Sequence, residues 1–287
     1  MSVNLKLRPG TPEDAAACGV IDFEAFKSIS SQHNFPWDFP SVEVATAVTM
    51  ALLSNPGFYA VVAELDEKIV GSNFLDERNL ISGVGPISVD PTVQNQAIGR
   101  QLMLAVMERS TQRRFAGIRL VQSAYHNRSL CLYTKLGFDT REPLSKMFGT
   151  LPKLKFAGYE VRTARELDLG ACNEICRRIH GHDRAGELRD AIRHGTATVV
   201  EHLGRITGYA SDIGMFGHAA GETTQDITAR IAAAPKIDGQ GFLLPTRNGE
   251  LFRWCLQNGF RLVHQMTLMT RGLYNEPAGA YLPSILY

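Results

Sequence analysis

The segment Ile81–Glu108 holds the residues whose order and spacing best suit a chemical role. A run rich in β-branched and small residues ends at Val89, Asp90 begins a turn, and a short loop then leads into an apolar stretch that predicts a helix. The first backbone N–H groups of a helix have no partner within it, and the helix dipole is positive there, so this end favours an anion. Small residues at Ala97 and Gly99 let a phosphate group approach the backbone closely.

The elements that must position this loop occur twice in the chain. Three groups of residues in the first half recur in the second half in the same order. The number of positions between each residue and its match decreases along the chain. The pairs are Leu7-Arg8, Asp14 and Ala17-Cys18 with Val161-Arg162, Asp168 and Ala171-Cys172; Glu64, Ile69 and Gly71 with Glu201, Ile206 and Gly208; and Gly137-Phe138 with Gly259-Phe260. A repeat of this length indicates a duplicated domain rather than a solenoid.

Each copy has the same predicted order of elements. A short strand leads to two helical stretches, then to a hairpin of β-branched strands, and then to alternating strands and helices. This order predicts an α/β fold with a mixed sheet in each half. Glycines and a proline in residues 149–158 mark a linker, so we expect one domain over residues 1–149 and a second over residues 158–287.

Composition limits the function. The chain has 287 residues, of which 44% are hydrophobic and 21% charged, with a formal net charge of +1. These values are typical of soluble globular proteins and give no support for electrostatic binding of nucleic acid or of an anionic membrane. No apolar run of signal-peptide or membrane-spanning length occurs, so we expect a cytoplasmic protein. Five sparse cysteines favour reduced thiols over a disulfide framework.

The loop resembles the acyl-CoA loop of the Gcn5-related N-acetyltransferases (GNAT), which has the pattern Arg/Gln-x-x-Gly-x-Gly/Ala after a strand that ends in Val-x-Pro. Here Gln94, Ala97 and Gly99 occupy the motif positions, and Val89-Asp90-Pro91 precedes them. Ala97 departs from the usual first glycine, and its methyl group would crowd a diphosphate. The resemblance implies acetyl-CoA, or another acyl-CoA, as co-substrate, and implies no metal.

A second stretch of residues supports the same resemblance. The sequence Asn127–Phe138 is similar to the family pattern Asn-x-x-Ala/Ser-x-x-Leu-Tyr-x-Lys-x-Gly-Phe. In the family the Asn contacts the pantetheine arm and the Tyr lies near the thioester sulfur, which implies these roles for Asn127 and Tyr133. A core aromatic with a satisfied hydroxyl is the alternative for Tyr133. The expected cofactor-binding residues are Ile87, Val89, Gln94, Asn95, Ala97, Ile98, Gly99, Arg100, Asn127 and Ser129.

The second copy lacks the phosphate motif. Its counterpart, residues 214–231, has no Gln-x-x-Gly-x-Gly spacing, and Cys255 stands where the first copy has Tyr133. We therefore expect a tandem duplication of the GNAT fold with a degenerate second copy that binds no CoA. The second copy is expected to close the acyl site and to shape the acceptor pocket.

The resemblance implies direct attack by an amine on the thioester within a ternary complex. Tyr133 is the expected acid for the departing thiolate, and no dedicated base is evident. The residues Asp76, Glu77, His33, Asp38, His218 and Glu222 are interpreted as solvated surface groups rather than bases, and a water chain is an alternative.

Several readings remain open. The acceptor is expected to be a small-molecule amine, with peptide or protein amines as alternatives. The rival hypothesis is a non-catalytic module that binds CoA or a metabolite. A third hypothesis is transfer of longer acyl groups, in which Phe74, Met103 and Met107 line a channel rather than the core. The loop Ser28–Ser41, rich in aromatics and prolines, is either a substrate contact or a surface loop held by its own aromatics. Cys172, Cys176 and His180 share one predicted helix face, which favours a core stripe over a zinc site.

Overall fold

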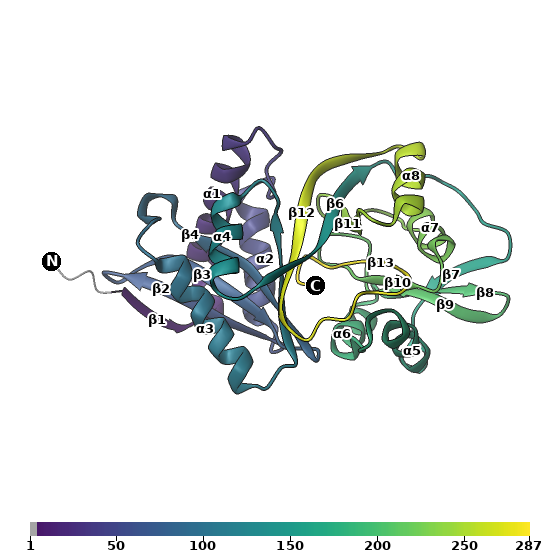
Figure 1. The fold of residues 1–287 in the computed structure, drawn as a ribbon, viewed down its shortest axis with the longest axis horizontal. Coiled ribbons are helices and arrows are strands. Elements are labelled where there is room, and N and C mark those ends of the chain that lie inside the picture. The colour runs from purple at the N-terminus through teal and green to yellow at the C-terminus, as the bar shows by residue number, and fades with distance from the viewer. Residues whose placement is uncertain (1–4) are drawn as a thin grey trace. The chain divides into compact units, whose positions relative to one another are not determined.

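The structure, a computed structural model, describes residues 5–287. The chain forms two compact units, shown with their elements in Figure 1. The first unit contains the residues up to Glu77 together with Ile81–Arg119, and the second contains Arg78–Leu80 and Leu120–Tyr287. Strand β5 (Gly117–Ser123) begins in the first unit and ends in the second. The residues between β6 and β7, which the sequence predicts as a linker, form no helix or strand.

The first unit is an antiparallel sheet with helices on both faces. Its elements in chain order are β1 (Leu5–Pro9), α1 (Ala15–Gln32), α2 (Val42–Ser54), β2 (Phe58–Leu65), β3 (Lys68–Asp76), β4 (Ile81–Val89) and α3 (Ile98–Gln112). Strands β1 to β4 pair in sequence order. The turn between β2 and β3 places Asp66 and Glu67 at φ angles of 48° and 65°, as a two-residue hairpin requires.

Successive residues of β3 show which helix covers which face of this sheet. A Cβ on Gly71 would lie 3.1 Å from the Leu102 side chain of α3, so glycine allows α3 to pack closely on this face. The next residue, Ser72, points to the opposite face and contacts the thiol of Cys18 on α1. Strand β4 is therefore covered by α3 on one side and by α1 on the other.

The second unit continues from β5 and contains the remaining elements: α4 (Asn127–Lys135), β6 (Asp139–Gly149), β7 (Tyr159–Thr163), α5 (Leu169–His180), α6 (Ala185–His194), β8 (Thr198–His202), β9 (Arg205–Ala210), β10 (Ala219–Gly221), α7 (Thr224–Ala232), β11 (Phe242–Pro245), α8 (Gly249–Gln257), β12 (Phe260–Gly272) and β13 (Ala280–Leu282). Strand β6 pairs antiparallel with both β11 and β12. A separate sheet has the order β13-β10-β9-β8-β7, with α5 and α6 on one side and α7 and α8 on the other in Figure 1.

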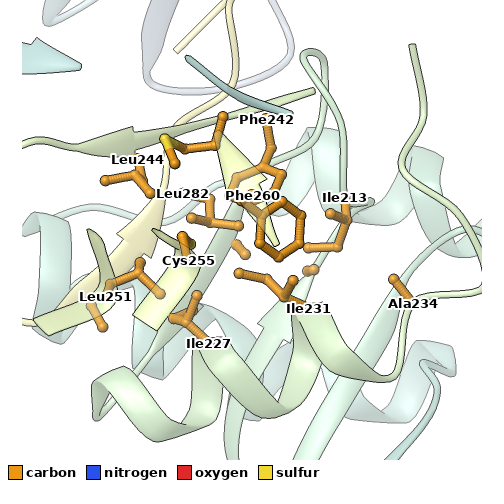
Figure 2. Packing of buried hydrophobic residues seen from close by; sticks show 14 residues of the cluster. Ile213, Ile227, Ile231, Ala234, Phe242, Leu244, Leu251, Cys255, Phe260 and Leu282 are labelled. Carbon is orange, nitrogen blue, oxygen red and sulfur yellow. The ribbon is translucent and has the colours of Figure 1, made fainter. Parts of the chain in front are cut away.

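A hydrophobic cluster joins α7, α8 and the neighbouring strands of the second unit (Figure 2). Phe242 and Phe260 meet edge to face with ring centroids 5.4 Å apart. Leu282 of β13 and Cys255 of α8 belong to the same cluster and are almost completely buried. The thiol of Cys255, whose pKa burial raises to about 12, is therefore a core side chain.

Equivalent ion pairs confirm the repeat predicted from the sequence. In the first unit Arg8 donates to both Asp14 and Glu64, with an Nε to Glu64 Oε1 distance of 2.7 Å. In the second unit Arg162 donates in the same way to Asp168 and Glu201, at 2.8 Å. A register shift occurs next to the matched glutamates in both hairpins. The same local structure at the matched positions shows that the two halves are copies of one fold.

Two smaller features refine the sequence analysis. Leu104 of α3 is 38% exposed, although its sequence neighbours are apolar, because α3 packs on the sheet along one face only. Phe74, Met103 and Met107 are buried in the first unit, which confirms the core reading of these three residues. Among the helices of residues 5–287, none has the length and apolarity needed to cross a lipid bilayer.

Candidate functional site

The loop between β4 and α3 forms a backbone cradle at the helix N-terminus. Asn95 and Ala97 adopt left-handed conformations, with φ angles of 69° and 61°, just before α3 begins at Ile98. The N-cap residue of α3 is Ala97, which has no side chain that could accept a hydrogen bond from this end of the helix. Its first N–H groups are therefore available to an anion, in the arrangement that binds phosphate groups at helix N-termini.

Side-chain contacts hold the cradle in place. The Gln94 side chain donates its Nε2 proton to the Val89 carbonyl oxygen at 3.1 Å, which ties the loop to the end of β4. Asp90 accepts from the backbone N–H of Thr92 at 2.8 Å and so stabilises the turn after the strand. Gln94 therefore has a structural role in the loop, in addition to the motif position that the resemblance gives it.

Gly99, in the first turn of α3, leaves space that the protein itself does not fill. A Cβ at this position would meet only the Val89 side chain, at 3.6 Å, which is an ordinary van der Waals contact. Packing within the described residues therefore does not require glycine here. The space above the N-terminus of α3 fits a group that must approach the backbone closely, such as the diphosphate of CoA.

Strand β4 leaves regular pairing just before the cradle. Ile87 lies opposite Asn73 of β3, whereas Val84 lies opposite Leu75, so two residues of β4 face one residue of β3. Gly85 is one of these two residues of β4, and its φ of 131° is accessible to glycine. Such a bulge turns the following segment of strand away from its neighbour, as expected for the wall of a cofactor groove.

The remaining predicted residues of this loop differ in their exposure. Asn95, Ala97 and Arg100 are exposed, whereas Ile87 and Val89 are half-buried. Ile98 is 2% exposed, so its side chain belongs to the core and only its backbone N–H is available at the cradle. Ala97 is exposed and has a left-handed backbone, which is strained for a residue with a Cβ. The family pattern has glycine at this position.

The three predicted residues on α4 lie in the second unit. Asn127 begins the helix and is exposed, and the Ser129 hydroxyl lies 2.7 Å from His126 Nδ1. Tyr133 is 6% exposed, and burial raises the pKa of its phenol to about 12. Its ring meets the edge of Phe138 with centroids 6.4 Å apart. The hydroxyl therefore stays protonated near neutral pH, as a proton donor must.

The interpretation of the candidate bases as solvated surface groups is wrong for several of them. Asp76 and His218 are 4% and 1% exposed. Burial lowers the pKa of His218 well below its usual value, and its Nε2 lies 3.1 Å from His180 Nε2. Glu77 accepts a bidentate pair from Arg109. Neither the burial of a side chain nor its ion pairing with a distant residue can be predicted from local sequence alone.

The aromatic loop is held by its own side chains. Trp37 meets the edge of Phe23, and Phe39 meets the edge of Phe26, with centroid distances of 6.0 and 5.5 Å. The Trp37 indole donates to Ser31 at 3.0 Å. These contacts favour the interpretation of a surface loop over a preformed substrate contact.

The corresponding helix of the second unit has no cradle. The carboxylate of Asp226, which is 1% exposed, accepts from the Thr223 backbone N–H at 2.8 Å and from the Thr223 hydroxyl at 2.7 Å. This capping box fills the N-terminus of α7 with a negative charge from the chain itself. A nearby pocket of about 400 Å³ has Glu222 and Glu250 in its lining together with Arg247, which is paired with Glu142, so its charged groups do not favour a diphosphate.

The cysteine stripe on α5 belongs to the core. Cys172 and Cys176 are fully buried in a hydrophobic cluster of the second unit, which confirms the core reading of these thiols. His180 at the end of α5 forms a hydrogen bond with His218 through its Nε2 and another with the Tyr287 hydroxyl through its Nδ1. Within residues 5–287, no group of three or more His, Cys, Asp or Glu side chains is arranged to hold a metal ion.

The sequence analysis missed Asp22, a fully buried carboxyl on α1. One of its oxygens accepts from the Thr49 hydroxyl at 3.0 Å, and burial raises its pKa from 3.8 to about 6. The sequence signal for a buried carboxyl at this position is an acidic residue within the apolar sequence CGVIDFEAF. The matched position of the second copy holds Cys176, which is uncharged, and this difference strengthens the signal.

Comparison with known proteins identifies the fold. Residues 56–140 match the model of the acetyltransferase (GNAT) domain. A putative acetyltransferase from Pyrococcus horikoshii is 19% identical with a TM-score of 0.73, over 96% of this chain and 91% of that one. A GCN5-related N-acetyltransferase from Sphaerobacter thermophilus is 14% identical with a TM-score of 0.61, over 95% and 96% of the two chains.

A third solved structure has the tandem arrangement of two GNAT domains. It is a tandem GNAT protein from the clavulanic acid biosynthesis pathway, 13% identical with a TM-score of 0.57, over 94% of this chain and 98% of that one. No curated protein sequence matches the chain. The full-length matches show that both halves together have the fold of tandem GNAT proteins, an α+β fold with mixed sheets.

Proposed function

We propose that this chain, which has the tandem GNAT fold, is an acetyltransferase that transfers an acyl group from acetyl-CoA to the amine of a small molecule. The cradle before α3 is the observation that carries the proposal. It combines two left-handed residues, an uncapped helix N-terminus and the free space above Gly99 within the segment that matches the GNAT domain. Each of these features favours the close approach of a diphosphate to the backbone.

In this proposal the backbone N–H groups of Ile98 and Gly99 bind the diphosphate of acetyl-CoA, and Asn127 contacts its pantetheine arm. The acceptor amine attacks the thioester carbonyl, a C–N bond forms, and the C–S bond breaks. Tyr133 donates its phenolic proton to the departing CoA thiolate, since the phenol is protonated near neutral pH. The proton released by the amine passes to water, and the tyrosinate then recovers a proton from solvent.

One observation favours a second candidate function, a CoA-binding module without catalysis. Ala97 holds a left-handed conformation that disfavours a residue with a Cβ, and the resemblance implies that its methyl group would crowd the diphosphate. Weak binding with no turnover would be the consequence. That the second copy shapes the acceptor pocket stays a prediction.

The proposed function is tested by release of free CoA thiol from acetyl-CoA in the presence of a panel of small primary and secondary amines. Turnover that depends on an amine and is lost in Gly99→Val supports the proposal. Saturable acetyl-CoA binding without turnover for any amine, peptide N-termini included, supports the binding module instead. Parallel reactions with longer acyl-CoA substrates establish the preferred chain length.

A further inference from the structure

Asp22 and Ser88 form an incomplete polar pair beneath strand β4. Asp22 on α1 is fully buried, and its Oδ2 accepts from the Thr49 hydroxyl of α2 at 3.0 Å. Its other oxygen, Oδ1, has no hydrogen-bond partner among the described residues, and neither has the hydroxyl of Ser88. The Ser88 hydroxyl faces the carboxyl and favours its charged form. A buried acceptor and a buried donor thus face each other closely enough for the hydroxyl to lower the pKa of the carboxyl, but without a hydrogen bond of ordinary geometry, which is an unfavourable arrangement for a protein interior.

The fold itself does not need this polar group, as the second copy shows. Because Cys18 matches Cys172, the residue four positions later, Asp22, matches Cys176. The pairing of β10 with β9, compared with that of β4 with β3, places Ala220 at the position of Ser88. Both Cys176 and Ala220 are buried in a hydrophobic cluster. The copy without a phosphate cradle therefore packs this position with a small thiol and a methyl group, whereas the copy with the cradle buries a carboxyl at a cost in stability.

The position of Ser88 connects this pair to the candidate site. Ser88 lies between Ile87 and Val89, the two β4 residues expected at the cofactor groove, and its side chain points to the opposite face, toward α1. Val89 also accepts the hydrogen bond from Gln94 that holds the cradle. A small rotation or shift of this strand segment changes the Asp22–Ser88 distance and the cradle together.

We propose that Asp22 is a positioning residue of the acyl-CoA site, which acts through Ser88: a hydrogen bond from the Ser88 hydroxyl to Asp22 Oδ1 forms when the cofactor binds and fixes the end of β4. This inference rests on the proposed function. The bond stabilises the ionised carboxyl, so cofactor binding lowers the pKa of Asp22 and releases a proton. Affinity for the cofactor then rises with pH through the range in which the free protein's Asp22 ionises.

Among the side chains packed around Asp22, Asp22 is the group whose charge changes over the pH range of the proposal. From α1 the nearest titratable group is Cys18, whose pKa burial raises to about 12, so the thiol stays neutral. Helix α2 contributes the Thr49 hydroxyl, and β3 and β4 contribute the hydroxyls of Ser72 and Ser88. Asp14, which acts on Cys18, is paired with Arg8.

The test is a calorimetric titration of the full chain with dephospho-CoA from about pH 5 to about pH 8. This probe keeps the diphosphate and lacks the 3′-phosphate, a group that itself titrates at about pH 6. For the unmodified chain, affinity is expected to rise about tenfold for each unit by which binding lowers the carboxyl pKa. In Asp22→Asn and in Ser88→Ala the affinity is expected to be nearly independent of pH. Glu24→Gln, an exposed carboxylate of the same helix, serves as the control and keeps the dependence.

The outcomes separate this inference from the proposed function. Saturable binding whose pH dependence is the same in Asp22→Asn as in the unmodified chain overturns the role of Asp22 and leaves the acyl-CoA site intact. Loss of the pH dependence in Asp22→Asn but not in Ser88→Ala overturns the part of Ser88. If neither dephospho-CoA nor acetyl-CoA binds to the unmodified chain at any pH, the proposed function is overturned, and this inference with it.

Discussion

Replacement of Asp22 by asparagine should stabilise the first unit at neutral and alkaline pH. Asparagine has nearly the same shape, and its side-chain oxygen can still accept from the Thr49 hydroxyl. Its amide can donate to the Ser88 hydroxyl, which has no partner among the described residues. The substitution therefore removes the charge of a fully buried group and keeps its hydrogen bonds.

The size and sign of the effect follow from the pKa of Asp22, which burial raises from 3.8 to about 6. Below pH 3.8 the carboxyl is protonated in both the folded and the unfolded chain, and its full contribution to stability is present. As pH rises toward 6, only the unfolded chain ionises, and that contribution is lost. Above the folded pKa the loss is complete and is on the order of 3 kcal/mol, at 1.36 kcal/mol per pKa unit.

Urea unfolding monitored by tryptophan fluorescence measures this effect. The two tryptophans lie in different units, so a Trp254→Phe background leaves Trp37 to report on the first unit. We expect Asp22→Asn to raise the free energy of unfolding by about 2 to 3 kcal/mol near pH 8, and the gain to shrink toward zero near pH 4. A gain independent of pH, or a loss of stability at pH 8, would refute the argument that the buried charge is the cause.

Three further variants test the candidate site, each by calorimetry with acetyl-CoA and by the rate of acyl transfer. Ala97→Gly should relieve the left-handed backbone, stabilise the protein by about 1 kcal/mol and tighten acetyl-CoA binding; weaker binding would show that the methyl group is not in the way. Gly99→Val should fold normally, as its thermal midpoint will report, and lose acetyl-CoA binding; retained affinity would place the diphosphate elsewhere. Tyr133→Phe should lower turnover more than acetyl-CoA affinity, and an unchanged rate would remove Tyr133 from the mechanism.

The repeat and the cradle could be predicted from the sequence because both depend on local order. Arg8, Asp14 and Glu64 recur with Arg162, Asp168 and Glu201, and each set forms the same ion-pair network. The turn at Asp90 and the helix after Ala97 likewise follow from neighbouring residues. Left-handed backbone at Ala97 is less readily predicted, since alanine there disagrees with intrinsic preference.

What the sequence could not predict depends on which elements meet in space. Asp22 pairs with Thr49 of another helix and faces Ser88 of a strand far along the chain, so its apolar sequence neighbours can indicate a buried carboxyl but not these partners. The same holds for β13, which pairs with β10 and thereby makes the last residues of the chain part of the second unit's sheet. His218 was interpreted as exposed for the same reason, since its burial depends on distant elements.

The number of acetyl-CoA molecules bound by each chain tests the central claim most directly. Calorimetric titration of the unmodified protein should give saturable binding of one acetyl-CoA per chain, because the cradle occurs before α3 and the capping carboxylate of Asp226 closes the matching helix end at α7. Gly99→Val, measured beside it, should give none. Two molecules per chain would contradict the assignment of a single site to the first copy, and no binding to the unmodified protein would contradict the acyl-CoA site itself.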